Sequence, residues 1–171
     1  DEYGFCQIDE SKCIHCGHCI SNCPFGALSS KKFIVPIIND IKAGKKVVAM
    51  CAPATEGQFG KDITMASVRQ ALMKAGFAEV VEVGLGGDMT AAYESLEWTE
   101  AAHEGKKMTT SCCPAFINMQ RQHFPKVFQE NVSSIVSPMC AISRYLKKTH
   151  PGCITVFLGP CIAKKSEAAD P

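Results

Sequence analysis

Four cysteines near the N-terminus stand at a spacing that binds iron. Cys13, Cys16, Cys19 and Cys23 are followed at once by Pro24, which gives the string C-x2-C-x2-C-x3-C-P. Thiolates at this spacing can each bind one iron of a four-iron cubane, because the two-residue gaps let the backbone curl round the cluster. In two-cluster versions of such a run, the fourth cysteine ligates the other cluster. The run therefore predicts a 4Fe-4S site, with Cys23 serving either this cluster or a second one.

Zinc and disulfides are weaker interpretations of these cysteines. Structural zinc sites usually bring two separated pairs or a mixture of cysteine and histidine, whereas this run is single and short. His15 and His18, between the cysteines, are expected on the loop surface. The odd total of 11 cysteines and the lack of an apolar leader favour a reducing, cytoplasmic location. The cysteines outside the iron-binding and catalytic strings are interpreted as structural: Cys6, Cys51, Cys140 and Cys153.

Composition excludes two classes of partner. The chain has 171 residues and a formal net charge of +1, which creates no field to attract nucleic acid or an anionic membrane. No apolar stretch approaches the roughly 20 residues that a membrane span needs. We therefore expect neither nucleic acid nor lipid as a partner.

Beyond the cysteine run, strand-like and helix-like segments alternate. Strands are expected at residues 47–50, 80–83, 107–110 and 154–158, and helices at residues 65–73, 88–103, 115–123 and 138–148. This order predicts an α/β fold, in which a small ferredoxin-like iron-sulfur domain precedes a parallel sheet flanked by helices. The sequence changes near residues 36–45 from a cysteine-rich segment to alternating strand-like and helix-like segments. We therefore expect two domains, at residues 1–37 and 38–171.

A segment that contains cysteine, glycine or charged residues follows each expected strand. These segments are residues 51–60, 84–90, 111–116 and 159–165. Because the carboxyl ends of parallel strands meet at one edge of a sheet, we expect one cofactor to contact all four. The run Gly84-Leu85-Gly86-Gly87 lacks the full dinucleotide-binding spacing and is interpreted as a turn that lets a bulky group approach, with Asp88 capping the next helix.

Three strings in the second domain carry a family resemblance. They are Thr110-Ser111-Cys112-Cys113-Pro114, Ser133-Ser134-Ile135-Val136-Ser137-Pro138 and Gly159-Pro160-Cys161-Ile162-Ala163-Lys164-Lys165. In this order they resemble the first two active-site signatures of the iron-iron hydrogenases, and the likeness extends upstream to Ala52-Pro53-Ala54 and the cysteine run. In that family a four-iron cubane is joined through a cysteine sulfur to a di-iron unit with carbon monoxide, cyanide and a bridging dithiolate amine. This H-cluster interconverts protons, electrons and dihydrogen.

The resemblance implies roles at the cluster itself. Cys113 and Cys161 resemble the first two cubane ligands. Cys112 resembles the free thiol that passes protons to the bridging amine, and adjacent residues on such a turn can point in different directions. Lys164 matches the lysine whose ammonium meets a cyanide ligand, and burying that charge is favourable only beside an anion.

Further residues match the pocket and the proton route of the family. The pocket positions are matched by Pro53, Ala54 and Ser137, with Ala54 where a serine is common. The carboxylates and the hydroxyl of the proton route are matched by Glu94, Glu97 and Ser133. Glu94 and Glu97 lie at i and i+3 on one helix face, so that a proton can pass along it. Without the resemblance, this pair would be interpreted as an ordinary solvated helix face.

The chain departs from the better-known catalytic members at several positions. Gly159 stands where a methionine is usual, Met139 where a glutamine is common, and Ala101 where an arginine can end the proton route. The third signature, which supplies the last two cubane cysteines, has no counterpart after Cys161. We therefore expect a complete H-cluster to need a C-terminal continuation or a partner subunit, and the isolated chain to be inactive.

The leading interpretation is the N-terminal part of an iron-iron hydrogenase, with residues 38–171 forming the first half of its catalytic domain. Electrons would enter through the N-terminal cluster from ferredoxin or another redox protein, and hydrogenase maturation proteins would build the di-iron unit. An iron-sulfur scaffold or assembly protein is one alternative, although a scaffold needs no proton route. A hydrogen sensor is another, with which Gly159 is compatible. A plain electron carrier leaves residues 110–165 unexplained.

Overall fold

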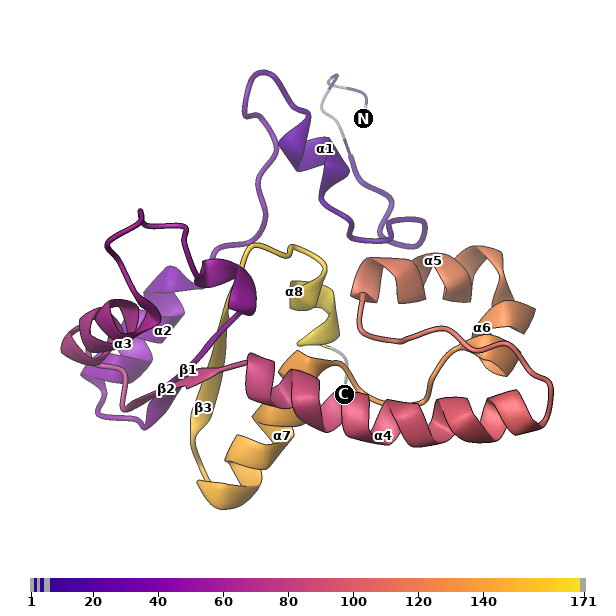
Figure 1. Cartoon of the computed structure of the whole chain (residues 1–171). Coiled ribbons are helices and arrows are strands. Elements are labelled where there is room, and N and C mark those ends of the chain that lie inside the picture. The colour runs from indigo at the N-terminus through magenta and orange to yellow at the C-terminus, as the bar shows by residue number, and fades with distance from the viewer. Residues whose placement is uncertain (1, 3, 5–6, 170–171) are drawn as a thin grey trace. The chain divides into compact units, whose positions relative to one another are not determined.

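The structure is a computed structural model that describes residues 2, 4 and 7–169 (Figure 1). The chain forms two units, each assembled from separate segments. Unit 1 contains residues 1–30, 101–134 and 161–171, and unit 2 contains residues 31–100 and 135–160. Cys6, interpreted above as structural, lies outside the described residues.

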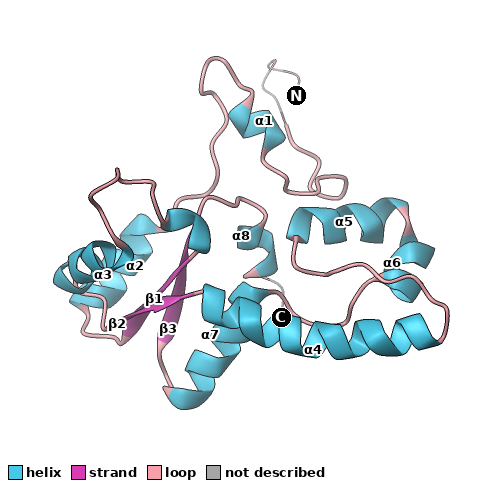
Figure 2. Cartoon of the chain, in the orientation of Figure 1, coloured by secondary structure: helices cyan, strands magenta, loops and turns pink. Residues whose placement is uncertain are grey.

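Unit 2 is built on a parallel three-stranded sheet in the order β2-β1-β3 (Figure 2). The strands are β1 (Val47–Cys51), β2 (Glu79–Glu82) and β3 (Ile154–Leu158). In the central strand, Ala49 pairs with Val80 on one side and Val156 on the other. Every residue of β1 is buried, as is typical of a parallel strand with helices on both faces of its sheet. The α/β fold class predicted from the sequence is confirmed.

Helices pack on both faces of this sheet. They are α2 (Ile34–Lys42), α3 (Met65–Lys74) and α7 (Pro138–Thr149). A short 3-10 turn η1 (Pro53–Thr55) follows β1, and helix α4 (Gly84–His103) follows β2 and lies against the start of α7. On one face, Val48 and Met50 pack with Ile142 of α7. On the other, Val47 and Ala49 pack with apolar side chains of α2 and α3. The alternation of side chains along β1 thus divides the core into two layers.

Caps set the ends of two helices that the sequence predicted. Thr64 caps α3 by accepting a hydrogen bond from the backbone N–H of Ser67 at 3.3 Å, and Gly76 follows that helix with a φ of +103°. Ser137 caps α7, because its hydroxyl accepts from the N–H of Cys140 at 3.5 Å, and Pro138 occupies the first helical turn. A side-chain oxygen before the helix and glycine after it satisfy backbone groups that the helix leaves unpaired.

The glycine run after β2 is not a turn, contrary to the prediction. Helix α4 begins at Gly84 and includes the whole run, so Asp88 lies inside the helix rather than at its cap. A Cβ atom on Gly86 would collide with the carbonyl oxygen of Pro138. Glycine is therefore required at this position because the backbones of α4 and α7 approach each other closely.

The strand predicted at residues 107–110 is also wrong. Only an isolated parallel bridge joins Thr109 to Val132 in this part of unit 1, with the N–H of Thr109 bonded to the Asn131 carbonyl at 2.7 Å. The segment carries one large apolar side chain, Met108, whereas a strand inside a parallel sheet needs apolar side chains on both faces. Segment 111–116 therefore does not follow a strand of the sheet, and the prediction of four segments at one sheet edge fails for this segment.

Unit 1 contains shorter helices. They are α1 (His18–Ser21), α5 (Pro114–His123), α6 (Pro125–Asn131) and α8 (Lys164–Glu167). The helix predicted at residues 115–123 is confirmed as α5, which packs with α6 and α8. Across the part of the chain that the structure describes, no helix has the length and apolar character needed to span a membrane.

Candidate metal centre

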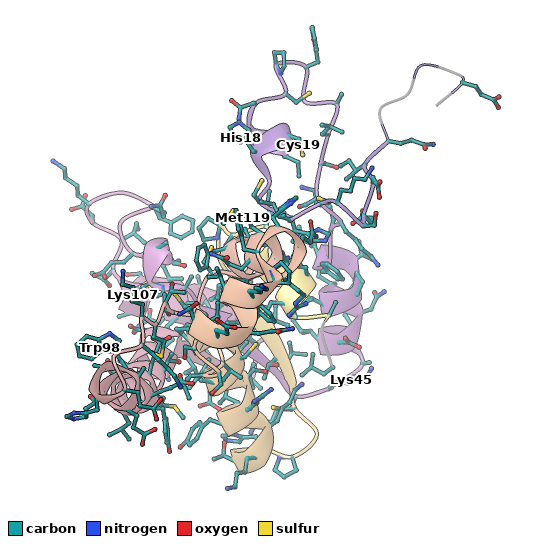
Figure 3. The ribbon with its side chains drawn as sticks, turned by 90° about the vertical axis from the view of Figure 1, so that its right-hand side faces the viewer. His18, Cys19, Lys45, Trp98, Lys107 and Met119 are labelled. Atoms are coloured by element: carbon teal, nitrogen blue, oxygen red, sulfur yellow. The ribbon has the colours of Figure 1, made fainter. Side chains whose placement is uncertain are left out.

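The cysteine run folds as a loop whose backbone N–H groups approach the sulfurs. Gly17 precedes α1 with a φ of +78°, a conformation that favours glycine. The Sγ of Cys13 accepts a hydrogen bond from the N–H of His15 at 3.4 Å, and the Sγ of Cys23 accepts one from the N–H of Ala27 at 3.3 Å. Cys16 and Cys19 are exposed, and His18 lies next to Cys19 on α1 (Figure 3).

Backbone dipoles lower the pKa of the Cys23 thiol. The N–H groups of Phe25 and Ala27 make the largest contributions, since they stabilise the thiolate. The thiolate is the form that binds iron. Cys23 is thus placed among groups that favour its ligating state.

The donor set fits a four-iron cluster in type and spacing. Ten described cysteines are free thiols, and soft thiolates are the ligands that iron-sulfur clusters use. Among the described residues, no three cysteine, histidine, aspartate or glutamate side chains converge as a ready metal site. Thiolates repel one another until a metal draws them together, so gathering of the sulfurs is expected to accompany cluster binding.

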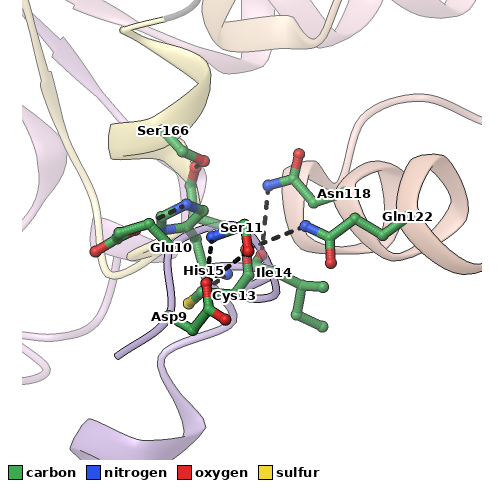
Figure 4. A network of polar contacts seen from close by, with 10 residues as sticks. Asp9, Glu10, Ser11, Cys13, Ile14, His15, Asn118, Gln122 and Ser166 are labelled. Atoms are coloured by element: carbon green, nitrogen blue, oxygen red, sulfur yellow. Dashed lines mark hydrogen bonds and ion pairs between the residues drawn. The ribbon is translucent and has the colours of Figure 1, made fainter. Parts of the chain in front are cut away.

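Helix α5 contacts the cysteine loop through two side-chain amides (Figure 4). Asn118 donates a hydrogen bond to the carbonyl of Ile14, and Gln122 donates one to the carbonyl of Cys13, both at 3.4 Å. The two amides are spaced i, i+4, which places them on one face of α5. Because Cys113 is the N-cap of the same helix, α5 connects the loop to the first catalytic signature.

The second signature also contacts the loop. A Cβ atom on Gly17 would lie 2.6 Å from Cδ1 of Ile162, the neighbour of Cys161. The ammonium of Lys165 donates to the hydroxyl of Ser30 at 2.8 Å. These residues all belong to unit 1. The segments around Cys113 and Cys161, which are far apart in sequence, therefore both contact the N-terminal loop.

The Lys164 ammonium lies against the backbone of Cys112. Its Nζ donates to the Cys112 carbonyl at 3.0 Å and to Oε2 of Glu167 at 2.7 Å. The side chains of Lys164 and Glu167 are only 13% and 18% exposed, so each charge is largely withdrawn from water and paired with the other. Sequence reasoning missed Glu167, although its i+3 spacing from Lys164 was a usable signal.

The expected proton-route residues divide between the units. Ser133, 5% exposed, lies in unit 1, where its N–H donates to the Thr109 carbonyl at 2.8 Å. Glu94 and Glu97 lie in unit 2 and are half-buried on α4. Oε1 of Glu94 is buried and has no hydrogen-bond partner among the described residues. A buried carboxylate oxygen without a partner is uncommon outside functional sites.

The expected pocket residues lie in unit 2. Pro53 opens η1, and Ser137 is 1% exposed and caps α7. Ala54 and Gly159 line a pocket of about 380 Å³ at the carboxyl ends of β1 and β3. A Cβ atom on Gly159 would lie 2.7 Å from the Phe157 ring, which therefore fills the space that a larger residue would take.

Cysteines outside the iron-binding and catalytic strings support the core. Cys51 and Cys153 are 1% and 7% exposed, and the Cys153 thiol lies 3.7 Å from the Leu146 carbonyl. Burial, with a smaller contribution from Glu82, raises the pKa of the Cys51 thiol. Cys140 is half-buried and packs against the core. The interpretation of Cys51 and Cys153 as buried small apolar residues is confirmed, whereas Cys140 is only half-buried.

Comparison with known proteins identifies the family. The model of the C-terminal domain of the iron-only hydrogenase large subunit matches residues 45–171. The chain belongs to this family. A 4Fe-4S binding domain matches residues 6–29, which confirms the predicted cluster type of the N-terminal loop. The H-cluster is the cofactor of the iron-only hydrogenase family to which the chain belongs.

Curated relatives are hydrogenases of greater length. The NADP-reducing hydrogenase subunit HndD of Solidesulfovibrio fructosivorans is 26% identical over 96% of the chain and 32% of its own length. Iron hydrogenase 1 of Clostridium pasteurianum is 30% identical over 86% of the chain and 29% of its own length. A periplasmic iron hydrogenase large subunit of Nitratidesulfovibrio vulgaris is 30% identical over the whole chain and 53% of its own length. The chain thus spans about a third to a half of the length of these relatives.

Proposed function

We propose that this chain is the part of an iron-only hydrogenase that receives electrons and delivers protons for the interconversion of protons and dihydrogen. The observation that carries the proposal is the contact of the cysteine loop with both catalytic signatures. Asn118 and Gln122 join the loop to the helix that begins after Cys113, and Gly17 meets Ile162 beside Cys161. A cluster that accepts electrons and two ligands of the catalytic cubane are thereby joined in one unit.

In this proposal the cysteines divide into three roles. The ligands of the electron-accepting cluster are Cys13, Cys16 and Cys19, with Cys23 completing it or serving a neighbour. Cys113 and Cys161 provide two of the four cubane ligands of the H-cluster. When bound, the H-cluster supplies the iron at which protons and electrons combine. Cys112 stays unligated, and its thiol gives and takes the proton at Sγ.

Lys164 places a positive charge beside the backbone of Cys112. Its ammonium is tied to the Cys112 carbonyl and balanced by Glu167, which offsets the cost of withdrawing the charge from water. One ammonium proton is left to stabilise an anionic ligand of the cofactor. Glu167 acts as a positioning residue in this arrangement, because it holds Lys164 without meeting the reacting atoms.

Glu94, Glu97 and Ser133 form the proposed proton route. The unpartnered Oε1 of Glu94 supports this role, since a buried carboxylate oxygen with an open acceptor position is suited to take a proton from a donor. Glu97, one helical turn further along α4, continues the same face. Pro53, Ala54 and Ser137 are the proposed pocket residues, and Ser137 also fixes the start of α7.

In this proposal the site is completed by residues beyond this chain segment and by other proteins. Two further cubane cysteines would come from a C-terminal continuation or a partner subunit, electrons from ferredoxin or a similar redox protein, and the di-iron unit from maturation proteins. We propose residues 1–37 as the electron-accepting domain and residues 38–171 as the first part of the catalytic domain. A cytoplasmic location stays a prediction, because one relative is named a periplasmic enzyme.

Infrared and electron paramagnetic resonance spectroscopy test the function. The chain is matured anaerobically, alone and together with the polypeptide that carries the two remaining cubane cysteines. We expect cubane signals in both samples, but iron-bound carbonyl and cyanide stretches and dihydrogen turnover only in the completed protein. A completed protein with cubane signals and no such stretches would instead be an iron-sulfur scaffold.

Two cysteine variants separate the proposed roles in the completed protein. Cys112→Ser is expected to keep the carbonyl and cyanide stretches and to lose turnover, because only the proton donor is changed. Cys113→Ser is expected to lose the stretches, because a cubane ligand is removed. Equal behaviour of the two variants would refute the division of roles between these adjacent cysteines.

A further inference from the structure

Helix α4 packs along one side and exposes large apolar side chains on another. Its inner side packs within unit 2, where Gly86 lies against the Pro138 carbonyl and the Thr90 hydroxyl donates to the Val136 carbonyl at 3.2 Å. On the outer side, Leu85 and Leu96 are 51% and 64% exposed. Large apolar side chains that gather on an exposed helix side are typical of an interaction surface. The outer side of α4 therefore has the composition of a covered face.

The outer residues follow the spacing of a helix-packing face. Leu85, Met89, Ala92 and Leu96 are separated by four, three and four residues, which is the alternation of the a and d positions in helices that pack along one another. We call these four residues the outer seam. They all lie in unit 2 and within one uninterrupted helix. The face that suits this seam is another helix with the same spacing.

The charges on α4 restrict what that helix can be. Between Gly84 and His103 the helix carries four carboxylates and no lysine or arginine. Two of the carboxylates, Asp88 and Glu100, are exposed and flank the outer seam. A second copy of α4 would bring like charges together along the flanks, which is unfavourable. The flanks are complementary to lysine or arginine on a different helix.

We propose that the outer seam binds an amphipathic helix with basic flanks, carried by the polypeptide that completes the hydrogenase domain. The identity of that polypeptide rests on the proposed function, whereas the chemistry of the helix rests on α4 alone. The relatives extend well beyond the matched segment, because the chain spans only 29% to 53% of their lengths. Binding of such a helix to the outer seam would hold α4 in place. Helix α4 also carries Glu94 and Glu97, which lie outside the seam.

Binding of two synthetic helical peptides tests the proposal directly. Both peptides have a leucine seam, one flanked by lysines and the other by glutamates, and binding to the chain is followed by fluorescence titration. We expect the lysine-flanked peptide to bind about tenfold more tightly or better. Equal affinities would overturn the proposed basic flanks. The measurement needs no iron, so a negative result leaves the proposed hydrogenase activity untouched.

Two double variants locate the binding face. Leu85→Glu with Leu96→Glu is expected to weaken binding of the lysine-flanked peptide about tenfold or more, because both side chains contact it. The matched control is Trp98→Glu with Tyr145→Glu, which changes two exposed aromatic residues outside the seam and is expected to bind as the unmodified chain does. Circular dichroism checks that both variants fold.

Two outcomes would overturn the assignment of the seam. The first is a control variant that loses binding as strongly as the seam variant. The second is a dimer of the unmodified chain in analytical ultracentrifugation that the seam variant abolishes, because the seam would then bind a second copy.

Discussion

The two units of the chain are stabilised by different interactions. Unit 2 holds nearly all the buried apolar side chains of the described residues, arranged in two layers about β1. Unit 1 has a short isolated bridge, small helices, and long polar contacts such as Gln122 to Cys13. Burial of apolar surface is the main driving force of folding. Unit 2 can therefore be ordered by its own core, whereas the N-terminal loop of unit 1 depends on the cluster that it binds.

Removal of two cluster ligands tests this contrast most directly. Cys16→Ser with Cys19→Ser is expected to abolish iron binding and to remove hydrogen-exchange protection from the cysteine loop, because cluster binding and loop folding are coupled. Protection of β1 is expected to stay unchanged. Iron analysis and hydrogen-exchange mass spectrometry measure both effects.

A control separates cluster loss from general damage. Cys140→Ser alters a half-buried cysteine of α7 and should leave the iron content as it is. If the ligand variant lowered the protection of β1 as much as that of the loop, the two units would not be independently ordered.

A core substitution tests the other unit. Ile142, fully buried in α7, packs on the sheet, and Ile142→Ala is expected to lower the free energy of unfolding of unit 2 by about 2–5 kcal/mol through lost burial and a cavity. Denaturant titration followed by circular dichroism measures the change. Tyr145→Ala, on the exposed side of the same helix, should change stability by less than about 0.5 kcal/mol. Release of iron by Ile142→Ala before the sheet unfolds would argue that the core also supports the cluster.

A smaller effect is expected at the contact of the loop with the second signature. Gly17→Ala adds a Cβ atom at a φ of +78° and against Ile162; the backbone strain alone costs about 1–2 kcal/mol. The expected result is faster loss of iron to a chelator, measured by absorbance. Gly57→Ala has a similar φ of +75° with open space around it, so it should release iron at the unmodified rate. Equal rates for the two variants would count against a contact that supports the cluster.

Part of the fold was predictable because local signals agreed with burial. Strands β1 and β3 are short, mostly apolar runs, β2 contains a pair of valines, and α3 and α7 have helical spacing with capping residues at their ends. The sequence of residues 107–110 suggested a strand, but none of these residues is buried, so the segment does not join the sheet. Helix α2 was not predicted, because its apolar start at Ile34 was grouped with the cysteine-rich segment.

The candidate site shows the same division. Cysteine spacing alone predicted the 4Fe-4S loop, which the family comparison confirmed. The contacts of Asn118 and Gln122 with the loop could not be predicted from the neighbouring sequence, because asparagine and glutamine on a helix surface usually face water. They join residues more than 100 positions apart in sequence. The roles of Cys112, Glu94, Glu97 and the remaining site residues stay predictions.

Thiolate spacing and apolar periodicity are local properties of the chain, so they were enough to indicate the cluster type and the three strands of the sheet, while the resemblance of three short strings indicated the family. Tertiary structure was needed to show that Gly86 serves the close packing of α4 on α7, and that Lys164 is tied to Cys112 and Glu167. It was also needed to show that the cysteine loop meets both catalytic signatures. Apart from the pairing of Lys164 with Glu167, each of these contacts joins residues that are far apart in sequence. A pattern within one segment does not indicate which distant segment will pack against it.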